Sequence, residues 1–539
     1  MGLLVEKFNM KKFTFRIVLV VYFTLFAALP IEAQPSLDNS FAGVGYKITK
    51  IDPFRDDIAR TVLVQPNGRI LTGGNSFNMI GYSNIAIARM KTNGAYDNTF
   101  GVAGIATIPG GFFCDMALLP NGKIIVAGSG VGPTNVNNYI VYRLNKNGTL
   151  DNSFGTGGSV EINIPYTGMI CYDVAIQSDG KIVLGGYSGG SGGYGNMLVV
   201  RLKPNGALDN TFGTAGKFTL LLSGKHSECH QLAIQPDGKI VAGGYIDTLV
   251  MYAFFRYDFA AIRLNTNGTL DNTFGVGGIV RADKGNTDDA YATALLSDGR
   301  IIIAGFSNYY VNNRFAALCI LPNGTIDMGF GTDGWIFLDF YGGSAIAQAL
   351  AIEPDDDIII GGYASVWADA VLNYSICLAK VSSNGIPDVT FGVSGLDTSF
   401  QSTITKACND IVLQPDGKIV VGGYQYIDGN GAYLTARYLN SVAFMRYDYA
   451  GGNSDFLVYP NPVMGQSISV NFKMPQSGKI ILKIYNLNGT VVFEQIQNLE
   501  DATTNHLELQ LPENLSDGIY IIETNNGKTK QTQKIQIIK

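Results

Sequence analysis

The sequence predicts an all-β protein, a seven-bladed β-propeller of four-stranded blades followed by a small immunoglobulin-like β-sandwich. The propeller prediction rests on an internal repeat, because the phrase Gln-Pro-Asp-Gly-Lys and its variants recur seven times. The composition agrees, since 66 glycines, 11% aromatic residues and only 15% charged residues are typical of a turn-rich, tightly packed β protein. The sandwich prediction rests on a separate pattern of short alternating strands after residue 455.

The N-terminal segment, residues 1–33, has the pattern of an export signal. Lysines and an arginine precede an apolar run from Ile17 to Leu29, and Ala33 offers a small residue for cleavage before Gln34. The apolar run is too short to span a bilayer comfortably. We therefore expect Sec export to the periplasm.

Each repeat carries a turn glycine and, later, an acidic phrase of the form Leu-Asp-Asn-x-Phe. In the sixth copy Asp356 stands where the glycine belongs, and we expect slight strain there because the turn needs a positive φ. The other turn glycines are Gly68, Gly122, Gly180, Gly238, Gly299 and Gly417. The aspartates of the acidic phrase lie 54 to 62 residues apart, at Asp38, Asp97, Asp151, Asp209, Asp271, Asp327 and Asp388.

Within a repeat the apolar pattern predicts four short strands, which is what a propeller blade needs. For the fourth unit we expect strands near Lys217 to Leu222, Gln231 to Gln235, Lys239 to Gly243 and Phe259 to Leu264. The propeller should occupy residues 34–449, with the strand near Tyr46 to Ile51 closing the ring against the last unit and removing exposed edges. Eight blades or an open array is the alternative.

The last strand of a unit carries a basic residue, and an aspartate follows about eight residues later in most units. We expect a repeated contact between the two, within or between blades. Because an active site needs its charges only once, the repetition favours a structural role. The basic residues are Arg89, Arg143, Arg201, Arg263, Lys380 and Arg446.

These repeated residues resemble the delta-60 repeat family of β-propellers over all seven units. The resemblance implies the fold and no assigned activity.

A second domain is predicted at residues 456–539, after a linker at 450–455. Its polar and apolar residues alternate, with turns at Asn488-Gly489 and Asp517-Gly518, as in a small β-sandwich. The expected strands are Ile468 to Phe472, Ile480 to Tyr485, Val491 to Phe493, Leu507 to Leu511, Ile519 to Ile522 and Lys534 to Ile538.

Four segments of this domain resemble the C-terminal sorting domain of type IX secretion cargo, namely Tyr459 to Pro462, Ile484 to Gly489, Gly518 to Tyr520 and Lys534 to Lys539. The resemblance implies a Bacteroidetes-type envelope and the type IX secretion machinery as a partner. It also implies a secreted or outer-membrane surface location, with removal of the domain and then release or attachment to lipopolysaccharide. An adhesion module that stays on the protein is the alternative.

Six cysteines in an exported protein raise the question of disulfides. Cys171, Cys229 and Cys408 each lie nine residues before the turn glycine, and Cys319 takes the place of the repeated arginine. Equivalent positions in different repeats are usually too far apart for a bridge. We therefore expect most cysteines to be buried and unpaired.

The segment from His226 to His230 is the one constellation that resembles a ligand set. Alternation on a strand would place His226, Glu228 and His230 on one face, which suits a metal sterically. Solvated or hydrogen-bonded side chains are the favoured interpretation, because no second cluster completes a coordination shell. Runs such as Asn145 to Asp151 are similar to calcium loops but lack the distal glutamate, so turn formation is favoured. No cofactor is predicted, with calcium as the alternative.

The functional surface is expected on dissimilar insertions rich in Tyr, Asn and Gly, which should cluster on one face. The alternative is that they only cap the blades. The insertions are Asn75 to Asn84, Gly130 to Asn138, Ser188 to Asn196, Ile246 to Tyr257, Ser307 to Arg314, Ala364 to Tyr374 and Gln425 to Tyr438. The candidate ligand-binding aromatics are Tyr252, Phe254, Phe255, Tyr309, Tyr310, Trp367 and Tyr426.

The favoured function is a secreted or surface-displayed scaffold, expected to be monomeric, that binds glycan, polymer or protein. A hydrolase or lyase acting at the channel mouth and a purely structural envelope protein are the alternatives, and no catalytic constellation supports an enzyme. Nucleic acid is excluded as a partner, since the net charge is -6 and basic residues cluster only within the first sixteen residues.

Overall fold

The computed structural model describes residues 37–440 and 456–538 with short gaps. The export signal at 1–33 and the linker at 450–455 lie outside the described residues. The gaps are 78–82, 132–136, 164–167, 190–194, 251–253, 285–286, 309–311, 341–342, 369–370, 393–394, 399–403, 460–462, 465–466, 473–477, 487–489, 500–505, 513–514, 516–517 and 526–529.

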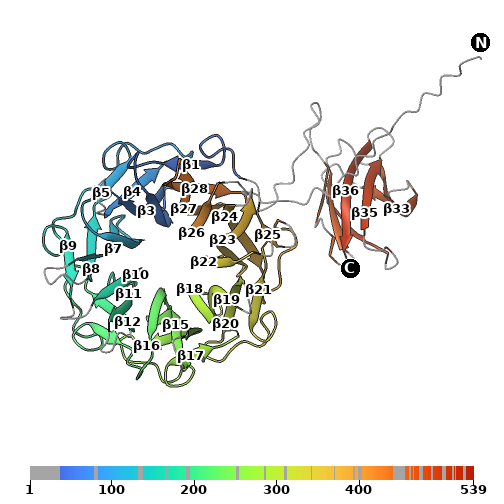
Figure 1. The fold of residues 1–539 in the computed structure, drawn as a ribbon. Helices are drawn as coiled ribbons and strands as arrows, with labels where there is room; N and C mark the ends of the chain where they lie inside the picture. Colours follow the sequence, from blue (N-terminus) through green and yellow to red (C-terminus); the bar gives the residue numbers. More distant parts are fainter. Residues whose placement is uncertain are drawn as a thin grey trace, which may run out of the picture. The chain divides into compact units, whose positions relative to one another are not determined.

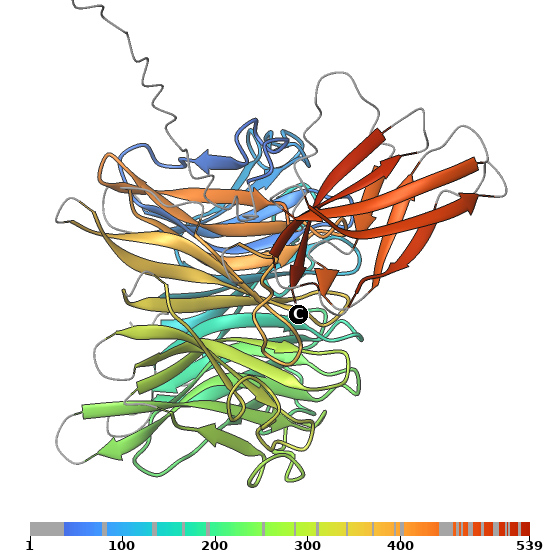
Figure 2. The same cartoon turned by 90° about the vertical axis from the view of Figure 1, so that its right-hand side faces the viewer.

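Seven four-stranded antiparallel sheets form a ring, as the sequence predicts (Figures 1 and 2). Blade 1 consists of β2 (Asp57–Val64), β3 (Ile70–Phe77), β4 (Ser83–Met90) and β5 (Ile105–Ile108). Blade 2 consists of β6 (Phe112–Leu118), β7 (Ile124–Val131), β8 (Asn137–Leu144) and β9 (Ser159–Ile162). Blade 3 consists of β10 (Met169–Ile176), β11 (Ile182–Gly189), β12 (Gly195–Leu202) and β13 (Lys217–Thr219).

The other four blades repeat this order. Blade 4 consists of β14 (Ser227–Ile234), β15 (Ile240–Val250), β16 (Phe254–Leu264) and β17 (Ile279–Ala282). Blade 5 consists of β18 (Thr287–Leu295), β19 (Ile301–Asn308), β20 (Asn313–Ile320) and β21 (Trp335–Leu338). Blade 6 consists of β22 (Ala345–Ile352), β23 (Ile358–Ala368), β24 (Val371–Val381) and β25 (Leu396–Asp397). Blade 7 consists of β26 (Lys406–Leu413), β27 (Ile419–Ile427), β28 (Asn430–Tyr438) and β1 (Tyr46–Thr49).

The first strand closes the ring by completing the last blade. β1 pairs antiparallel with β28, with Tyr46 opposite Ala436, and this confirms the predicted closure. The division into blades differs by one strand from the prediction, because the strand at Lys217 ends blade 3 and does not begin blade 4. In a cyclic repeat, the sequence alone does not show which strand of the repeat begins a blade. The pairing of β1 with β28 shows it here, because β1 is the fourth strand of its blade and every other blade follows the same order.

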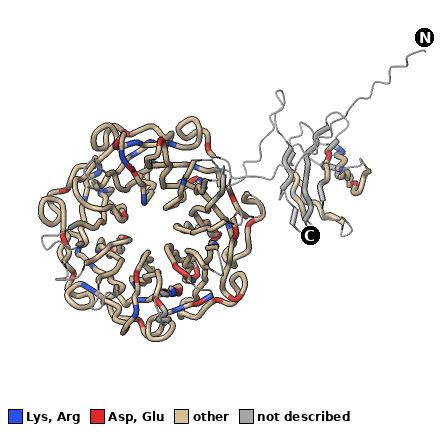
Figure 3. Tube along the Cα trace, viewed as in Figure 1, with Lys and Arg blue, Asp and Glu red and all other residues tan. Residues whose placement is uncertain are grey.

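A repeated arginine joins blades 1, 2, 3, 4 and 7 each to the next blade of the ring. In blade 3, Arg201 Nε lies 2.9 Å from Asp209 Oδ2, and Arg201 Nη1 donates to the Thr266 carbonyl of blade 4 at 2.5 Å. The predicted contact is therefore confirmed, and it acts both within and between blades. Basic and acidic residues recur together around the ring (Figure 3). The equivalent pairs are Arg89–Asp97, Arg143–Asp151, Arg263–Asp271 and Arg437–Asp38.

The prediction of Arg446 as the basic residue of the last unit is wrong. Arg437 holds that position on β28, and Arg446 lies outside the described residues. The sequence pattern predicts an insertion at residues 425–438. They instead form a tight hairpin whose turn uses positive φ values at Asp428 and Gly429, so the strand comes earlier than expected.

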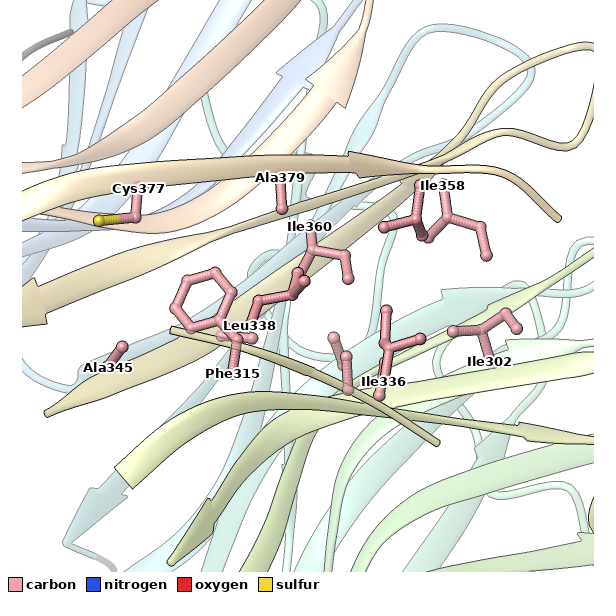
Figure 4. Close-up of a cluster of buried hydrophobic side chains, with 14 of the residues drawn as sticks. Ile302, Phe315, Ile336, Leu338, Ala345, Ile358, Ile360, Cys377 and Ala379 are labelled. Carbon is pink, nitrogen blue, oxygen red and sulfur yellow. The ribbon is translucent and has the colours of Figure 1, made fainter. Parts of the chain in front are cut away.

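The apolar core lies between neighbouring blades. Figure 4 shows one such cluster, in which Phe315 and Ile336 of blade 5 pack near Ile360 and Ala379 of blade 6. Glycine permits the close approach, since a Cβ on Gly185 would lie 2.6 Å from the Cys229 sulfur of the next blade. All six cysteines are free, and five of them are buried, as expected.

The second compact unit spans residues 445–539 and is a two-sheet sandwich. Residues of both sheets, such as Val470, Ile484, Leu509 and Ile522, share one buried core. One sheet contains β29 (Phe456–Tyr459), β31 (Ser467–Phe472) and β34 (His506–Gln510). The other contains β30 (Val463–Met464), β36 (Lys530–Ile538), β35 (Gly518–Asn525), β32 (Gly478–Asn486) and β33 (Val491–Leu499). Among the described residues of the whole chain, no helix has the length and apolarity needed to cross a membrane.

Candidate functional site in the propeller channel

The innermost strand of every blade carries a β-bulge at the same position. In blade 3 the register of β10 on β11 shifts between Cys171 and Asp173, so Tyr172 has no partner across the sheet. A bulge re-aims its extra residue, and bulges are common beside active sites. The seven bulged residues, which we call the channel collar, are Arg60, Cys114, Tyr172, His230, Tyr291, Gln348 and Asn409.

All seven collar residues line one cavity of about 1110 Å³ in the centre of the ring. Each lies eight residues before the turn position of its repeat, yet the copies carry six different residue types. The channel is therefore the place where a shared backbone presents unlike side chains.

The residue after the bulge is buried between blades and has a structural role. Asp173 Oδ2 accepts the Leu232 N–H of the next blade at 2.7 Å, and Asp410 Oδ2 accepts the Val62 N–H at 2.8 Å. Burial raises the pKa of Asp410 to about 8. Burial, followed by the neighbouring Asp115, raises the pKa of Asp173 well above its ordinary value. These buried carboxyl groups tie the inner strands together, and Asp410 is largely protonated at neutral pH.

Glu228 on β14 is the centre of a tyrosine–histidine cluster at the channel wall. Its Oε1 lies 2.7 Å from His226 Nε2 and its Oε2 lies 3.2 Å from His230 Nε2. Burial alone would raise the pKa of Glu228, but hydrogen bonds from the two histidines lower it to about 2. Glu228 is therefore a carboxylate at neutral pH, held between two imidazoles.

His230 is held by contacts at both ring nitrogens and by two neighbouring aromatic rings. Its Nδ1 lies 3.0 Å from the Ala290 carbonyl, so this nitrogen donates, while Nε2 faces Glu228. The Tyr291 ring stacks on it at 4.9 Å, and the Tyr172 ring meets it edge-on at 4.8 Å. Burial lowers the pKa of His230, but Asp289 and then Glu228 raise it above the ordinary value. The arrangement favours the imidazolium form.

Further aromatic residues extend the cluster away from the collar. Tyr245 on β15 pairs across the sheet with Glu228, and its ring lies 4.4 Å from that of Tyr257 on β16. The Tyr187 ring on β11 lies 5.7 Å from the His226 ring. Burial and then Glu228 raise the pKa of Tyr187 and Tyr245. These hydroxyls therefore stay protonated near neutral pH and can donate hydrogen bonds.

The geometry at His226, Glu228 and His230 is that of a hydrogen-bonded set. His226 precedes β14 and His230 is its bulged residue, so regular alternation does not place the three side chains; each histidine takes a separate oxygen of Glu228. In the described part of the chain, the acidic group compact enough for a cation is Glu353, Asp355 and Asp357. The Lys380 ammonium already lies 2.5 Å from Glu353 Oε2.

The asparagine runs that are similar to calcium loops form turns. In the first of them, Asn147 Oδ1 accepts the Thr149 N–H at 3.2 Å, and Asn145 Nδ2 donates to the Leu150 carbonyl at 3.1 Å. The aspartate that ends this run, Asp151, is bound to Arg143. The contacts agree with the turn interpretation.

The predicted insertions are largely β-hairpins. Residues 246–257 were expected as a loop, but β15 and β16 stay paired as far as Val250 opposite Phe254. Phe254 and Phe255 therefore lie in β16 and Trp367 lies in β23, with side chains outside the described part. Tyr426 is half-buried, its ring 5.8 Å from that of Tyr424. Three other candidates lie outside the described residues: Tyr252, Tyr309 and Tyr310.

The sequence prediction missed Arg60, Tyr172, Asp289 and Tyr291, because alternation within a strand does not reveal a bulge. Alignment of the seven copies on their turn position would have shown the collar as the most varied column of its surroundings, with six residue types against three at the preceding position and four at the following one.

Comparison with known families and structures identifies both parts of the chain. Residues 457–539 match the secretion system C-terminal sorting domain. The family described as "domain of unknown function (DUF5122) beta-propeller" matches residues 65–100, 119–154, 177–212, 235–274, 296–330 and 414–441. The sixth repeat, which carries Asp356, falls between these segments. No curated protein matches the chain.

Three solved structures show distant similarity. Drosophila plexin A in complex with semaphorin 1b is 11% identical, with a TM-score of 0.37 over 75% of this chain and 88% of that one. A PL25 ulvan lyase bound to a GlcA(1-4)Rha3S saccharide is 12% identical, with a TM-score of 0.41 over 76% and 95%. A Penicillium chrysogenum α-L-arabinanase complexed with arabinobiose is 11% identical, with a TM-score of 0.36 over 62% and 96%.

The C-terminal match fixes the destination of the protein. A tail of this family marks type IX secretion cargo, which is secreted or attached to the cell surface. The expected repeat family and the expected sorting domain are both confirmed. The chain therefore carries DUF5122 β-propeller repeats followed by a secretion system C-terminal sorting domain.

Proposed function

We propose that this exported protein binds a saccharide chain in the propeller channel, against the collar and the tyrosine–histidine cluster. The observation that carries the proposal is the cavity of about 1110 Å³, where tyrosines of blades 3 to 5 surround Glu228 and His230. Ligand pockets in proteins typically combine aromatic walls with a few fixed polar groups. Sugars suit such a lining, since they present an apolar ring face and hydroxyl groups at its edge.

Several contacts favour binding over catalysis. His230 engages both ring nitrogens with protein acceptors, so neither is free to take a proton from a ligand. The pKa of Tyr172 and Tyr291 is raised, by burial first, so a tyrosinate base is not available at neutral pH. A general base needs a free site for the proton it removes. The cluster instead offers fixed donors and two acidic side chains, Glu228 and Asp289, that both face His230.

The direct test is retention of the full exported protein on an array of glycans and polysaccharides. Tyr291→Ala removes a ring from the cluster and should weaken binding at least about tenfold, given the usual contribution of one aromatic contact. Tyr426→Ala is the matched control, because Tyr426 lies on the β27–β28 hairpin and not in the channel lining. If only Tyr426→Ala loses binding, the ligand lies on the hairpins and not in the channel. If the protein converts a bound glycan into product, the protein is an enzyme and the binding proposal is wrong.

A further inference from the structure

Arg60 is exposed in the channel and is not used by the fold. It is the bulged residue of β2 and lines the central cavity. Among the described residues, no carboxylate or carbonyl pairs with its guanidinium. The other arginines of the described propeller each contact a partner.

The collar around Arg60 is cationic or neutral. None of its seven side chains is a carboxylic acid, and its other ionisable cation is His230. Five acids line the cavity, and all are already engaged. Glu228 binds two histidines, and Asp289 Oδ1 lies 3.5 Å from His230 Nδ1. Asp115, Asp173 and Asp410 accept backbone N–H groups. Arg60 also lies close enough to Tyr363 and Tyr424 for its charge to act on both hydroxyls. A charge with no protein partner in a cavity is an anchoring point for an anion.

We propose that the saccharide of the preceding section is acidic, and that Arg60 binds its anionic group, a carboxylate or a sulfate ester. The inference rests on the proposed channel-binding function. A guanidinium fork forms two parallel hydrogen bonds with a carboxylate or sulfate, which an ammonium cannot reproduce. The tyrosine–histidine cluster, on the far side of the ring from blade 1, contacts neutral hydroxyl groups of the same chain.

The test is titration of the full exported protein with polygalacturonate, dextran sulfate and uncharged dextran of matched length. We expect an acidic polymer to bind and dextran to bind at least about tenfold more weakly, with affinity falling as salt increases. Arg60→Gln should lower the affinity for the acidic polymer at least about tenfold and flatten its salt dependence, whereas Arg60→Lys should recover only part of it. The control is Arg314→Gln, which removes an arginine paired with Asp339 outside the cavity lining.

The outcomes separate the two proposals. Preference for polygalacturonate over dextran sulfate assigns the carboxylate, and the reverse preference assigns the sulfate ester. Full affinity in a folded Arg60→Gln protein, or equal binding of dextran, overturns the acidic-ligand inference. In that case sensitivity to Tyr291→Ala would leave the channel as the binding site. If the wild-type protein binds none of the three polymers, the acidic-ligand inference is wrong. The glycan array, with Tyr291→Ala as the test variant, then shows whether the channel binds a saccharide at all.

Discussion

At the scale of residues, the positions that recur hold blades together and the positions that differ face the channel. Blade 5 shows how strictly the recurring contacts are kept. Cys319 replaces the arginine there, and Arg300, which directly precedes β19, places Nη1 3.2 Å from Asp327 Oδ2. The same nitrogen donates to the Ser383 carbonyl of blade 6 at 2.8 Å. Blade 5 therefore keeps its link to blade 6 through a different residue.

Arg300→Ala should accordingly destabilise the propeller more than loss of an equivalent residue in a blade that has its own arginine. We expect a cost of about 2 kcal/mol for Arg300→Ala, since Asp327 and a carbonyl lose a partly buried cation. Lys239→Ala in blade 4 should cost less than about 1 kcal/mol, because Arg263 still binds Asp271. Urea unfolding of both variants measures the difference, and equal costs would contradict the compensation.

A second residue-scale prediction concerns pH. The unfolded chain releases the Asp410 proton near its ordinary pKa of 3.8, whereas the folded protein keeps it up to a pKa of about 8. The folded state therefore binds more protons between these values, and this group lowers stability as the pH rises from about 4 to about 8. Asp410→Asn cannot ionise and keeps an oxygen that can accept the Val62 N–H.

Urea unfolding at pH 5, 6.5 and 8 measures the effect. The wild-type protein should lose at least about 1 kcal/mol more than Asp410→Asn over this range. Parallel stability profiles for the two proteins would show that Asp410 is ionised in the folded state.

At the scale of elements, the sequence predicts strands and turns well, because these depend on local chemistry. The turn glycines have positive φ as expected, and Asp356 has a φ of 68°. Asp356 is held there by Ser297 of blade 5, whose backbone N–H donates to its carboxylate at 2.9 Å and whose hydroxyl donates at 2.5 Å. The sequence of one repeat could not predict the bulge, because a bulge places two residues of one strand opposite one residue of its partner. It could not predict the blade boundaries either, because these depend on how the ring closes.

Substitution of Asp356 should separate backbone strain from these hydrogen bonds. Asp356→Gly relieves the positive φ but loses the Ser297 contacts, so we expect a change within about 1 kcal/mol. Asp356→Ala loses the contacts and keeps the strain, and it should be about 1 kcal/mol less stable than the glycine variant. Thermal or urea unfolding ranks the pair; an alanine variant as stable as the glycine variant would show that the turn carries no strain.

At the scale of the whole molecule, each part of the chain has a separate task. The ring of blades, closed by β1 on β28, surrounds the channel, and the C-terminal sandwich is the sorting domain that marks the protein for export. Fold and export could be predicted from the sequence because repeats and sorting segments are patterns of neighbouring residues. The candidate site could be predicted only in part, since His226, Glu228 and His230 adjoin in sequence while Tyr172 and Tyr291 come from other blades.

Removal of residues 456–539 tests the export task. We expect the truncated protein to remain in the periplasm, because the sorting domain is lost while the propeller is intact. Immunoblots of periplasmic and extracellular fractions give the readout, with a fusion of residues 456–539 to an unrelated periplasmic protein as the control. Normal extracellular amounts of the truncated protein would contradict this role.

The central claim is that the ligand lies in the channel, where the seven copies differ. Hydroxyl-radical footprinting of the exported protein, with and without a saccharide retained on the array, tests it most directly. We predict that ligand lowers the oxidation rates of Tyr172, His230 and Tyr291 and leaves that of Tyr426 unchanged. Protection of Tyr426 with no change at the three channel residues would contradict the account.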